Sequence, residues 1–420
     1  MRYAKRGATN APGLIFADAP LTGVSAAGTP EFIMANPYGD FFPDESTASI
    51  RNFIVGNLDT ARDAAGLRSA FGIATPISAA GSPLGIWHIE EETPTAYLMA
   101  RFEIQRLPTE GNFGLRAVRT QESVSGGQSV PGTSAIVAVD RRSTYTDYLP
   151  SADLRYRLGQ GLYLRASASK TLTRPNFDQL SPSLTLIRNP TNPALNQGGA
   201  GNPDLKPIRA DNLDVAVEKY FNATTSLYLT AFLKNVDGFV TTVSGPEIYD
   251  GVTYQVSRPQ NNTAADVNGF EAGYQQFYDF LPGWLSGFGI QANYTYVDSE
   301  TPDRTLGASV PLQNLSRRSF NLIGLYERGK VSARLAYNWR EKFLSGVTSI
   351  VGVGALPIYT RDYSWLDASV SYRFNDRISL AIEGMNLLGT ERRSYYGVQT
   401  RPQSNWVNDM QISATATVRL

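Results

Sequence analysis

The sequence predicts an all-β protein, an antiparallel up-and-down β-barrel that crosses a membrane with its strands. Three observations support this prediction. Apolar and polar residues alternate with period two along many short segments. The connections between these segments are alternately short and long, and aromatic residues gather near the segment ends. A soluble β-sandwich is the alternative, but it would not require this regular alternation of connection lengths.

Period-two alternation gives each predicted strand two unlike faces. Leu164 and Ala166 share one face of segment 162–169, whereas Arg165 and Ser167 share the other. The same pattern recurs in residues 331–340, 366–374, 378–383 and 412–420. One-sided sheets of soluble proteins alternate in the same way, so this pattern predicts strands without placing them in a membrane.

The spacing of the strands carries the barrel prediction. About thirteen strands are expected, beginning near residues 97, 112, 145, 161, 210, 224, 267, 287, 316, 330, 363, 377 and 404. Short turns such as Asn375–Asp376 alternate with long loops, and the longest internal loop runs from about Thr173 to Ala210. Membrane barrels carry short turns at one rim and long loops at the other, so we expect antiparallel pairing between nearest neighbours only.

The N-terminal part is expected to differ from the rest. An odd strand count makes the first strand, from Tyr97, run from the long-loop side to the short-turn side. We therefore divide the chain into residues 1–94, a strand stub followed by a long extracellular loop, and residues 95–420, the barrel strands. The stub and the last strand would be two open edges, which a barrel does not tolerate in hydrocarbon.

Composition excludes several classes of protein. The chain has 420 residues with 38 basic and 38 acidic side chains, so its net charge is zero. It lacks the excess of positive charge that is typical of a nucleic-acid-binding protein. It has no cysteine, which excludes disulfide scaffolds and thiolate zinc sites. Its single histidine, His88, leaves no multi-histidine metal site, and we expect neither a metal nor a cofactor.

No segment reaches the roughly 18 consecutive apolar residues of a membrane helix. Residues 1–6 resemble the charged start of a signal peptide, but the apolar run behind them, Leu14–Ala17, is shorter than the roughly 7 residues that such a peptide needs. We therefore expect Met1 to be an interior start and the chain to be a fragment.

Charged residues on the polar strand faces are expected to line the lumen, since a charge on the lipid face would cost about 2–4 kcal/mol at mid-depth. These residues are Arg155, Arg165, Glu218, Arg334, Arg340, Asp367 and Glu383. They would guide a solute or form a hydrated wall, and the sequence leaves both roles open.

Two motifs could indicate a cofactor site or a catalytic site, and each also has a purely structural interpretation. Gly287–Ala292 fits a dinucleotide-binding pattern, but it runs directly into an alternating strand instead of a helix, so we interpret it as a turn and strand start. His88 would be the base of a serine hydrolase. Its neighbours Glu90–Glu92 are better interpreted as a solvated outer rim.

Several motifs between about Tyr97 and Leu420 follow one another in the order of a known family. They are Gly111–Thr120, Leu149–Tyr156, Arg165–Lys170, Arg174–Phe177, Gly201–Pro207, Asn293–Val297, Leu335–Arg340 and Glu383–Leu387. Together they resemble the C-terminal part of the β-barrel of TonB-dependent outer-membrane receptors, in a branch often tied to carbohydrate uptake. The resemblance implies a receptor or transporter of the bacterial outer membrane, not an enzyme.

The family resemblance implies a barrel of about 22 strands whose lumen is closed by an N-terminal plug. The sequence departs from this pattern, because the plug, the energy-coupling segment and about the first nine strands are absent and the chain ends in Leu420 instead of phenylalanine. We therefore expect a plug-less fragment that cannot perform gated uptake alone. The inward charges could hold the missing plug by ion pairs.

The resemblance also implies partners. They are outer-membrane lipid, the TonB energy-transducing complex acting through the missing plug, the barrel assembly machinery and a small-molecule substrate. The substrate would be a scarce or bulky solute, with an oligosaccharide favoured and an iron–siderophore complex or cobalamin as alternatives. A passive outer-membrane channel, an outer-membrane binding protein and, less favoured, an outer-membrane hydrolase stay open as other functions.

Ligand contacts are expected from the outer loops, where aromatic rings near Asp and Asn suit stacking on sugars. The candidate residues are Tyr38, Phe41, Phe42, Trp87, Tyr249, Tyr254, Tyr359, Tyr395 and Tyr396. Packing within the loops is the alternative role for each of them.

Overall fold

The computed structural model describes residues 3–10, 33–35, 54–57, 83–130, 135–189, 191–261, 264–303, 306–350 and 353–419. Contacts divide the chain into two units, Met1–Thr9 with Trp87–Leu420, and Asn10–Ile86. The second unit contains the antiparallel pair β2 (Ile33–Ala35) and β3 (Ile54–Gly56), followed by the short helix η3 (Pro83–Gly85). No helix within the described ranges is long and apolar enough to cross a membrane.

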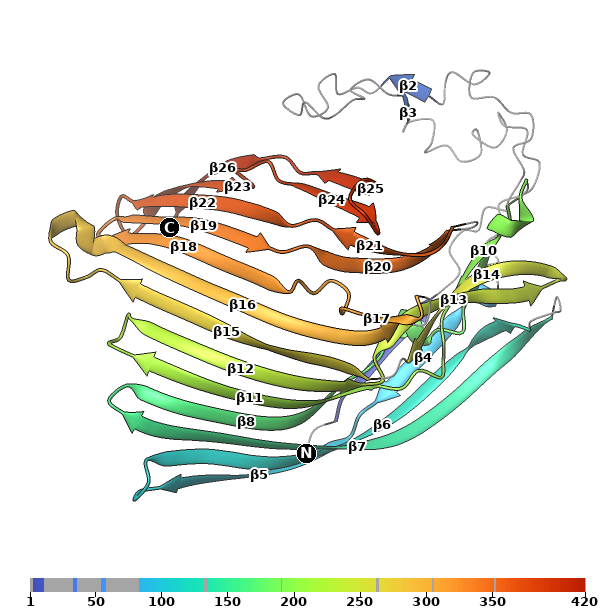
Figure 1. Ribbon diagram of the computed structural model, residues 1–420, viewed down its shortest axis with the longest axis horizontal. Helices are drawn as coiled ribbons and strands as arrows, with labels where there is room; N and C mark the ends of the chain where they lie inside the picture. Colours follow the sequence, from blue (N-terminus) through green and yellow to red (C-terminus); the bar gives the residue numbers. More distant parts are fainter. Residues whose placement is uncertain are drawn as a thin grey trace. The chain divides into compact units, whose positions relative to one another are not determined.

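The first unit is built on one large sheet (Figure 1). Its hydrogen-bonded order is β1 (Lys5–Asn10), β4 (Trp87–Glu92), β6 (Thr109–Ser129), β7 (Ile136–Gly159), β8 (Leu162–Thr173), β11 (Ile208–Tyr220), β12 (Ser226–Asp237), β15 (Ala265–Phe277), β16 (Phe288–Asp303), β18 (Arg318–Arg328), β19 (Val331–Arg340), β22 (Tyr363–Arg373), β23 (Ile378–Met385) and β26 (Gln411–Val418). In addition, β5 (Thr95–Ile104) pairs with β6, and β17 (Ala308–Val310) pairs with β16. The all-β antiparallel prediction is confirmed.

The connections alternate as the sequence predicts. Short turns join β5 to β6, β7 to β8, β11 to β12, β18 to β19 and β22 to β23, and all of them lie at one end of the sheet (Figure 1). The long connections at the other end hold their own strands and short helices. The motif at Gly287–Ala292 is the end of a turn and the start of β16, so the interpretation as a turn and strand start is confirmed.

Two strand starts differ from the prediction, and one strand was not predicted. The strand expected from Tyr97 is β5, which begins at Thr95, but another strand of the large sheet, β4, pairs with β6 and precedes β5, separated from it only by Thr93 and Pro94. Pro94 has no N–H to donate to the ladder, but its carbonyl accepts a hydrogen bond from Arg119 N at 3.0 Å. The sheet therefore begins before the predicted boundary at residue 95. The strand expected near 145 begins at Ile136, and the last strand of the large sheet begins at 411 instead of 404.

Two smaller sheets are made by the long connections. The first has the order β13 (Val240–Tyr249), β14 (Val252–Asn261), β10 (Gln197–Ala200) and β9 (Leu184–Ile187). The second has the order β20 (Phe343–Ile350), β21 (Gly354–Thr360), β24 (Glu391–Tyr396) and β25 (Pro402–Val407). The pair β10–β14 is parallel, so the prediction of antiparallel pairing throughout was wrong here. These two strands belong to different long connections. No tight hairpin joins them, so no turn forces them to be antiparallel.

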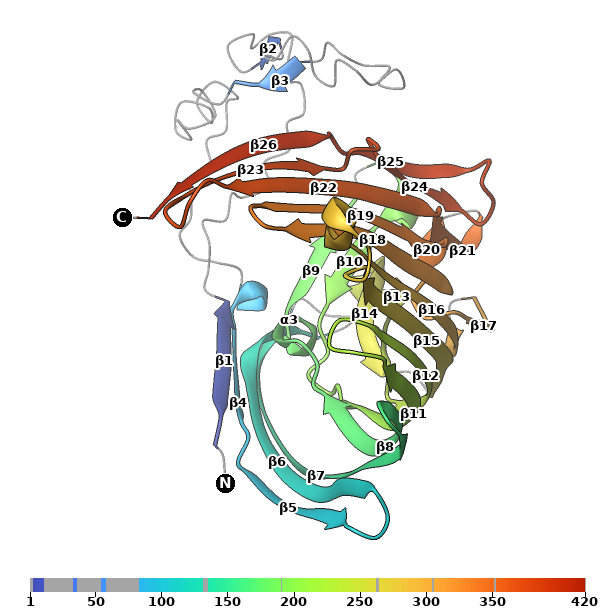
Figure 2. The ribbon, with the colours of Figure 1, turned by 90° about the vertical axis from the view of Figure 1, so that its left-hand side faces the viewer.

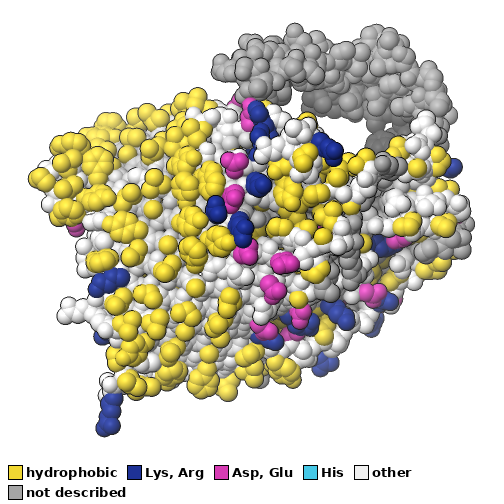
Figure 3. Space-filling model, viewed as in Figure 1, with side chains coloured by type: hydrophobic (Ala, Val, Ile, Leu, Met, Phe, Trp, Pro, Cys, Tyr) yellow, Lys and Arg dark blue, Asp and Glu magenta, His cyan; other side chains and the backbone are white. Residues whose placement is uncertain are grey.

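The large sheet curves so that one face is concave (Figure 2). Hydrophobic side chains cover much of the convex face towards the short-turn end (Figure 3). Leu335 and Val370 stand on this face with half of their surface exposed, 50% and 52%. Exposed aliphatic side chains at alternate positions are typical of a lipid-facing surface.

Buried apolar side chains gather where the long connections meet the sheet. Leu180 of helix α3 (Phe177–Leu180) and Leu205 pack against Ile89 and Val124 of the sheet. A second cluster in the β9–β10–β13–β14 sheet contains Leu184, Tyr249, Tyr254 and Val256. The ordered core of this protein therefore lies at the long-connection end, where it holds the connections in place.

Candidate functional site

The concave face carries a charged groove of about 640 Å³ near the short-turn end, which we call the lumen groove. It is lined by Arg101, Phe102, Glu103, Glu110, Gly111, Asn112, Asp153, Leu154, Arg155, Arg165, Ala166, Ser167, Asp214 and Ala216. These residues come from five strands, β5, β6, β7, β8 and β11. Period-two alternation brings the polar residues among them to one face, because they occupy the same parity on each strand.

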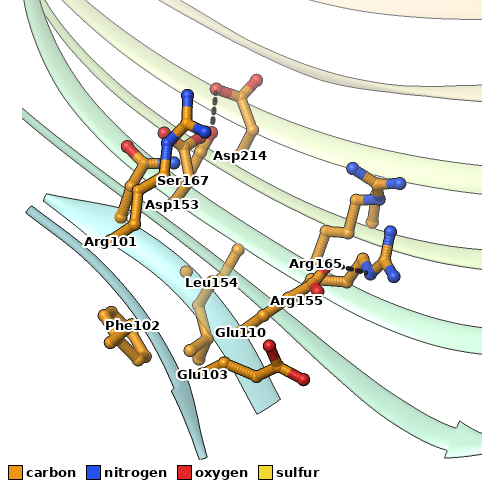
Figure 4. Close-up of a pocket in the computed structure, with 14 residues that line it drawn as sticks. Arg101, Phe102, Glu103, Glu110, Asp153, Leu154, Arg155, Arg165, Ser167 and Asp214 are labelled. Atoms are coloured by element: carbon orange, nitrogen blue, oxygen red, sulfur yellow. Dashed lines mark hydrogen bonds and ion pairs between the residues drawn. The ribbon is translucent and has the colours of Figure 1, made fainter.

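Ion pairs cross between neighbouring strands in the lumen groove. Arg155 Nε lies 2.7 Å from Glu110 Oε1, and Arg165 Nε lies 2.9 Å from Glu218 Oε1. In Figure 4, Arg101 lies with Ser167, Asp153 and Asp214 at one end of the groove. The Ser167 hydroxyl donates to Asp214 Oδ2 at 3.3 Å.

The other charged residues predicted to line the lumen occupy strand positions that alternate onto the same, concave face. Arg334 borders an inner pocket together with Asn338. Asp367 accepts a hydrogen bond from the backbone N–H of Asn386 at 2.9 Å. Glu383 is paired in register with Ser369 and Ser413, which continues the polar face across β22, β23 and β26.

A second recess on the inner wall, near the long-connection end, is centred on Arg340. This Arg340 recess has a volume of about 340 Å³. It is lined by Thr295, Val297, Leu315, Ser316, Ser319, Asn321, Asn338, Trp339, Arg340, Tyr363 and Trp365. Its mixture of aromatic rings with a few polar groups is typical of small-molecule sites, which occupy roughly 300–1,000 Å³.

Hydrogen bonds hold the guanidinium of Arg340 in place. Its Nε donates to Ser316 Oγ and its Nη2 donates to the carbonyl of Asn314, both at 2.9 Å. The same guanidinium lies 4.1 Å from the ring centroid of Phe343 and 5.8 Å from that of Tyr363. These contacts fix the position of the positive charge without neutralising it.

A second arginine shares the ring of Tyr363. The Arg392 guanidinium from β24 lies 5.5 Å from this ring centroid. Within the described part of the chain, neither Arg340 nor Arg392 forms an ion pair with a carboxylate. Two uncompensated positive charges therefore flank one aromatic ring.

The family is shown by comparison of the sequence with family models. Residues 16–387 match the family described as TonB dependent receptor-like, beta-barrel. The chain belongs to the TonB-dependent receptor family. It is therefore a protein of the bacterial outer membrane, and the family assignment made from the motifs is confirmed.

Solved structures of outer-membrane receptors resemble this receptor. The ferric-catecholate import receptor Fiu of E. coli K12 matches with a TM-score of 0.57 and 17% identity over 81% of this chain and 47% of that one. The ferric yersiniabactin uptake receptor FyuA of Yersinia pestis gives 0.55 and 15% identity, over 79% and 46%. The ferric enterobactin receptor PfeA of Pseudomonas aeruginosa, as its Q482A mutant, gives 0.52 and 15%, over 79% and 55%.

At these identities the structural likeness shows the fold alone. The receptor chain spans about half the length of the structures that it matches. No protein of curated function matches it at a significant level of sequence similarity.

The aromatic residues predicted to contact ligand from the outer loops do not lie together in one site among the described residues. Tyr38, Phe41 and Phe42 lie outside the described residues. Trp87 is not a loop residue, because it belongs to β4 and packs against the Ile89–Leu180 cluster. Tyr249, Tyr254 and Tyr395 are buried in the two smaller sheets, Tyr359 stacks on Tyr395 with ring centroids 5.8 Å apart, and Tyr396 is half-buried. These five tyrosines lie in strands, because the long connections fold into sheets with cores of their own.

One of these tyrosines belongs to a polar cluster between β13 and β14. Arg258 donates to both carboxylate oxygens of Glu247, from Nε at 2.7 Å and from Nη2 at 2.9 Å. The Tyr249 hydroxyl also donates to Glu247. The Arg258 guanidinium therefore lowers the pKa of the Glu247 carboxyl below its ordinary value. Burial raises the pKa of Tyr249, and the bond to Glu247 raises it further.

The acidic segment beside His88 was expected to be a solvated rim, and this was wrong for Glu91. Its side chain is only 2% exposed, and its two carboxylate oxygens accept hydrogen bonds from Arg6 Nε and Nη2, both at 2.9 Å. Arg174 Nε lies 3.4 Å from Glu91 Oε1. His88 is exposed and its Nδ1 lies 2.7 Å from Thr9 Oγ1. No group of three metal-ligating side chains is found in the described ranges of the chain.

The aromatic part of the Arg340 recess was not predicted from the sequence. Neither Tyr363 nor Trp365 is among the residues predicted to line the site. Both have the parity of Asp367, which was assigned to the lumen, so the alternation in β22 contained the signal. No pattern in the sequence indicated that Arg392 would lie near this recess. It belongs to the connection between β23 and β26, and only folding brings it to Tyr363.

Proposed function

We propose that this chain is part of an outer-membrane receptor that takes up a scarce or bulky solute, energised by the TonB system. We further propose that the solute is an anionic iron–siderophore complex instead of the oligosaccharide favoured from the sequence. Membership of the family and the ferric-siderophore receptors among the similar structures support this choice.

The observation that carries the proposal is the pair of uncompensated arginines at Tyr363. A guanidinium that is fixed in place and has no carboxylate partner favours an anionic ligand. The ring of Tyr363 offers a face for stacking, which suits a ligand with planar aromatic groups. An uncharged sugar would stack on the ring but would leave both charges without a partner.

The lumen groove suits a second partner of the whole receptor. Its mixed acidic and basic residues, with Arg101, Asp153 and Asp214 beside the ion pairs, would bind a folded polypeptide with complementary charges. In this family that polypeptide would be the plug, through which the TonB complex acts. Outer-membrane lipid and the barrel assembly machinery are the other expected partners.

Equilibrium binding tests the solute class. A ferric catecholate complex and a neutral maltooligosaccharide are titrated against the receptor, and tryptophan fluorescence is measured, since Trp365 borders the recess. We expect saturable binding of the ferric complex, weakened about tenfold or more in Arg340→Gln, because a hydrogen bond to a charged group contributes about 1.5–3 kcal/mol. Arg392→Gln should weaken it in the same direction.

Arg334→Gln is the matched control, because Arg334 faces the lumen outside the Arg340 recess. This variant should bind the ferric complex with unchanged affinity. Equal affinity of wild type and both recess variants would reject the recess as the solute site. Saturable binding of the oligosaccharide that is lost in Arg340→Gln would restore the carbohydrate assignment.

A further inference from the structure

The connection between β15 and β16, residues 278–287, differs from the other connections at the short-turn end. The others are two to five residues long. Gln160–Gly161 and Gly329–Lys330 carry no large apolar side chain, and each of the other three carries a single exposed one, Leu107, Phe221 or Phe374. The β15–β16 connection is ten residues long, and Asp279 is its one charged residue. In place of charge it presents large apolar side chains.

Two aromatic rings of this connection are exposed. Phe280 is 68% exposed and Trp284, within the short helix η5 (Gly283–Gly287), is 64% exposed. Trp284 packs edge-on against Phe288 with ring centroids 5.7 Å apart, and Phe288 packs edge-on against Tyr326 at 4.9 Å. Trp284, Phe288 and Tyr326 therefore form a continuous row from the turn onto the ends of β16 and β18, and Phe280 packs edge-on against Tyr278 with ring centroids 6.0 Å apart.

This row continues the lipid-facing surface. Phe288 and Tyr326 are directly paired in register, and Phe288 has the opposite parity to Gln291 and Asn293, which line an inner pocket. Both rings therefore stand on the outer face of the sheet. Figure 3 shows hydrophobic side chains over this end of the β15–β16 hairpin.

The turn is held firmly in this position. Tyr278 N donates to the carbonyl of Phe288 at 2.8 Å, and Leu281 N donates to the carbonyl of Tyr278 at 2.9 Å. Gly287 is buried, and a Cβ there would lie 2.9 Å from the ring of Tyr326 and from the Cβ of Arg328. Close packing against β18 thus fixes the backbone of the turn, which lowers the ordering cost of inserting the exposed rings.

We propose that the β15–β16 connection is a lipid anchor that inserts Phe280 and Trp284 into the phospholipid headgroup layer at the short-turn side of the membrane. Amphipathic rings favour this layer, where one edge stays apolar and the other meets water. The lipid surface is favoured over a protein partner because the row of rings is continuous with the surface that already faces lipid. The proposal goes beyond solute uptake and is independent of which solute is carried.

Site-directed spin labelling tests the anchor directly. The chain has no cysteine, so each single substitution provides one labelling site. Nitroxides are attached in Phe280→Cys and Trp284→Cys, with Gln160→Cys and Asp376→Cys as controls in polar turns. The receptor is placed in vesicles of phosphatidylethanolamine and phosphatidylglycerol, and collision rates with oxygen and with a water-soluble nickel chelate are compared.

We expect the oxygen-to-nickel ratio to be several-fold higher at 280 and 284 than at 160 and 376, because oxygen concentrates in lipid. Equal ratios at all four positions would overturn the proposal and would favour a water-exposed surface open to a protein partner.

A second measurement leaves the native rings in place. Wild type and Trp284→Phe are compared in vesicles whose lipids carry bromine just below the headgroups. Wild type should lose a larger fraction of its fluorescence than Trp284→Phe, because Trp284 lies at the depth of the quencher. Equal fractional quenching of the two proteins would count against insertion of Trp284 even if the cysteine variants fail to fold.

Discussion

Glu90 and Glu91 are neighbours in β4 with opposite surroundings. Glu90 lies 2.8 Å from Lys5 Nζ, and both of these side chains are exposed to solvent by a third or more. Glu91 is buried and bound by Arg6 and Arg174. A solvent-exposed ion pair contributes about 0–1 kcal/mol, whereas hydrogen bonds to a charged group that is buried contribute about 1.5–3 kcal/mol.

We therefore expect Glu91→Gln to lower the free energy of unfolding by about 2 kcal/mol, and Glu90→Gln to lower it by less than about 1 kcal/mol. The measurement is urea unfolding of the receptor in lipid bilayers. Equal losses in the two variants would show that the burial of Glu91 has no energetic consequence.

Glu247 gives the β13–β14 sheet a defined dependence on pH. Arg258 lowers the pKa of Glu247 in the folded sheet below its unfolded value of 4.5. A lowered folded pKa means that the stabilisation is fully present above pH 4.5 and is lost as the pH falls below it. The smaller sheet should therefore open more readily in acid than at neutral pH.

Amide hydrogen exchange checks this expectation. Protection in β13 and β14, corrected for the intrinsic pH dependence of exchange, should fall below about pH 4.5 in wild type. In Glu247→Gln it should be lower at neutral pH and should change less across the same range. A wild-type profile that is flat from neutral pH to pH 3 would contradict the role of this ion pair.

The strands of the large sheet separate lipid from lumen by alternation alone. Val370 stands on the convex face and is 52% exposed, whereas Ser371, the next residue in β22, stands on the concave face. The two side chains are at nearly the same depth, so they form a matched pair. A charge on the lipid face loses its hydration, and a charge on the lumen face keeps it.

Val370→Arg should destabilise the membrane-inserted barrel by about 2–4 kcal/mol, whereas Ser371→Arg should cost much less. Folding into bilayers of defined thickness, followed by denaturant titration, measures both. Leu335→Arg and Asn338→Arg on β19 make a second comparison of the two faces, at positions three residues apart. Similar costs on the two faces would mean that the convex face does not contact lipid.

Aromatic rings lie over glycines of the neighbouring strands and set the local packing of the sheet. Tyr228 of β12 is paired with Gly273 of β15, and a Cβ at this glycine would lie 2.2 Å from the Tyr228 ring. Phe102 covers Gly111 in the same way, from β5 to β6. A ring that covers a glycine removes its exposed backbone from solvent and helps to fix the strand register.

At the scale of the whole molecule, the two ends of the large sheet carry different features. The lumen groove lies at the short-turn end, whereas the Arg340 recess and the smaller sheets lie at the long-connection end. Membership of the receptor family predicts that the long connections face the outside of the cell.

Labelling of intact cells tests this orientation. Gly245→Cys lies in β13, where a Cβ meets no atom within 4 Å, and Asp376→Cys lies in a short turn. A membrane-impermeant maleimide should label position 245 on intact cells, and position 376 only after the outer membrane is opened. Labelling of position 376 on intact cells would reverse the assignment of the two ends.

The sequence by itself determined the strands, their faces and the family. Strand alternation and the lengths of connections are local properties, so the strands of the large sheet from β5 to β23 and the inward parity of Arg155, Arg165, Arg334 and Arg340 could be predicted from them. The same parity would have placed Tyr363 and Trp365 in the lumen.

Only the tertiary structure decided the environments at the long-connection end. Glu91 is buried because Arg6 and Arg174, far away in sequence, reach it. Arg392 reaches Tyr363 because two long connections fold into one sheet, and β10 pairs in parallel with β14 for the same kind of reason. These contacts depend on how distant segments dock on one another, and no local period in the sequence records that docking.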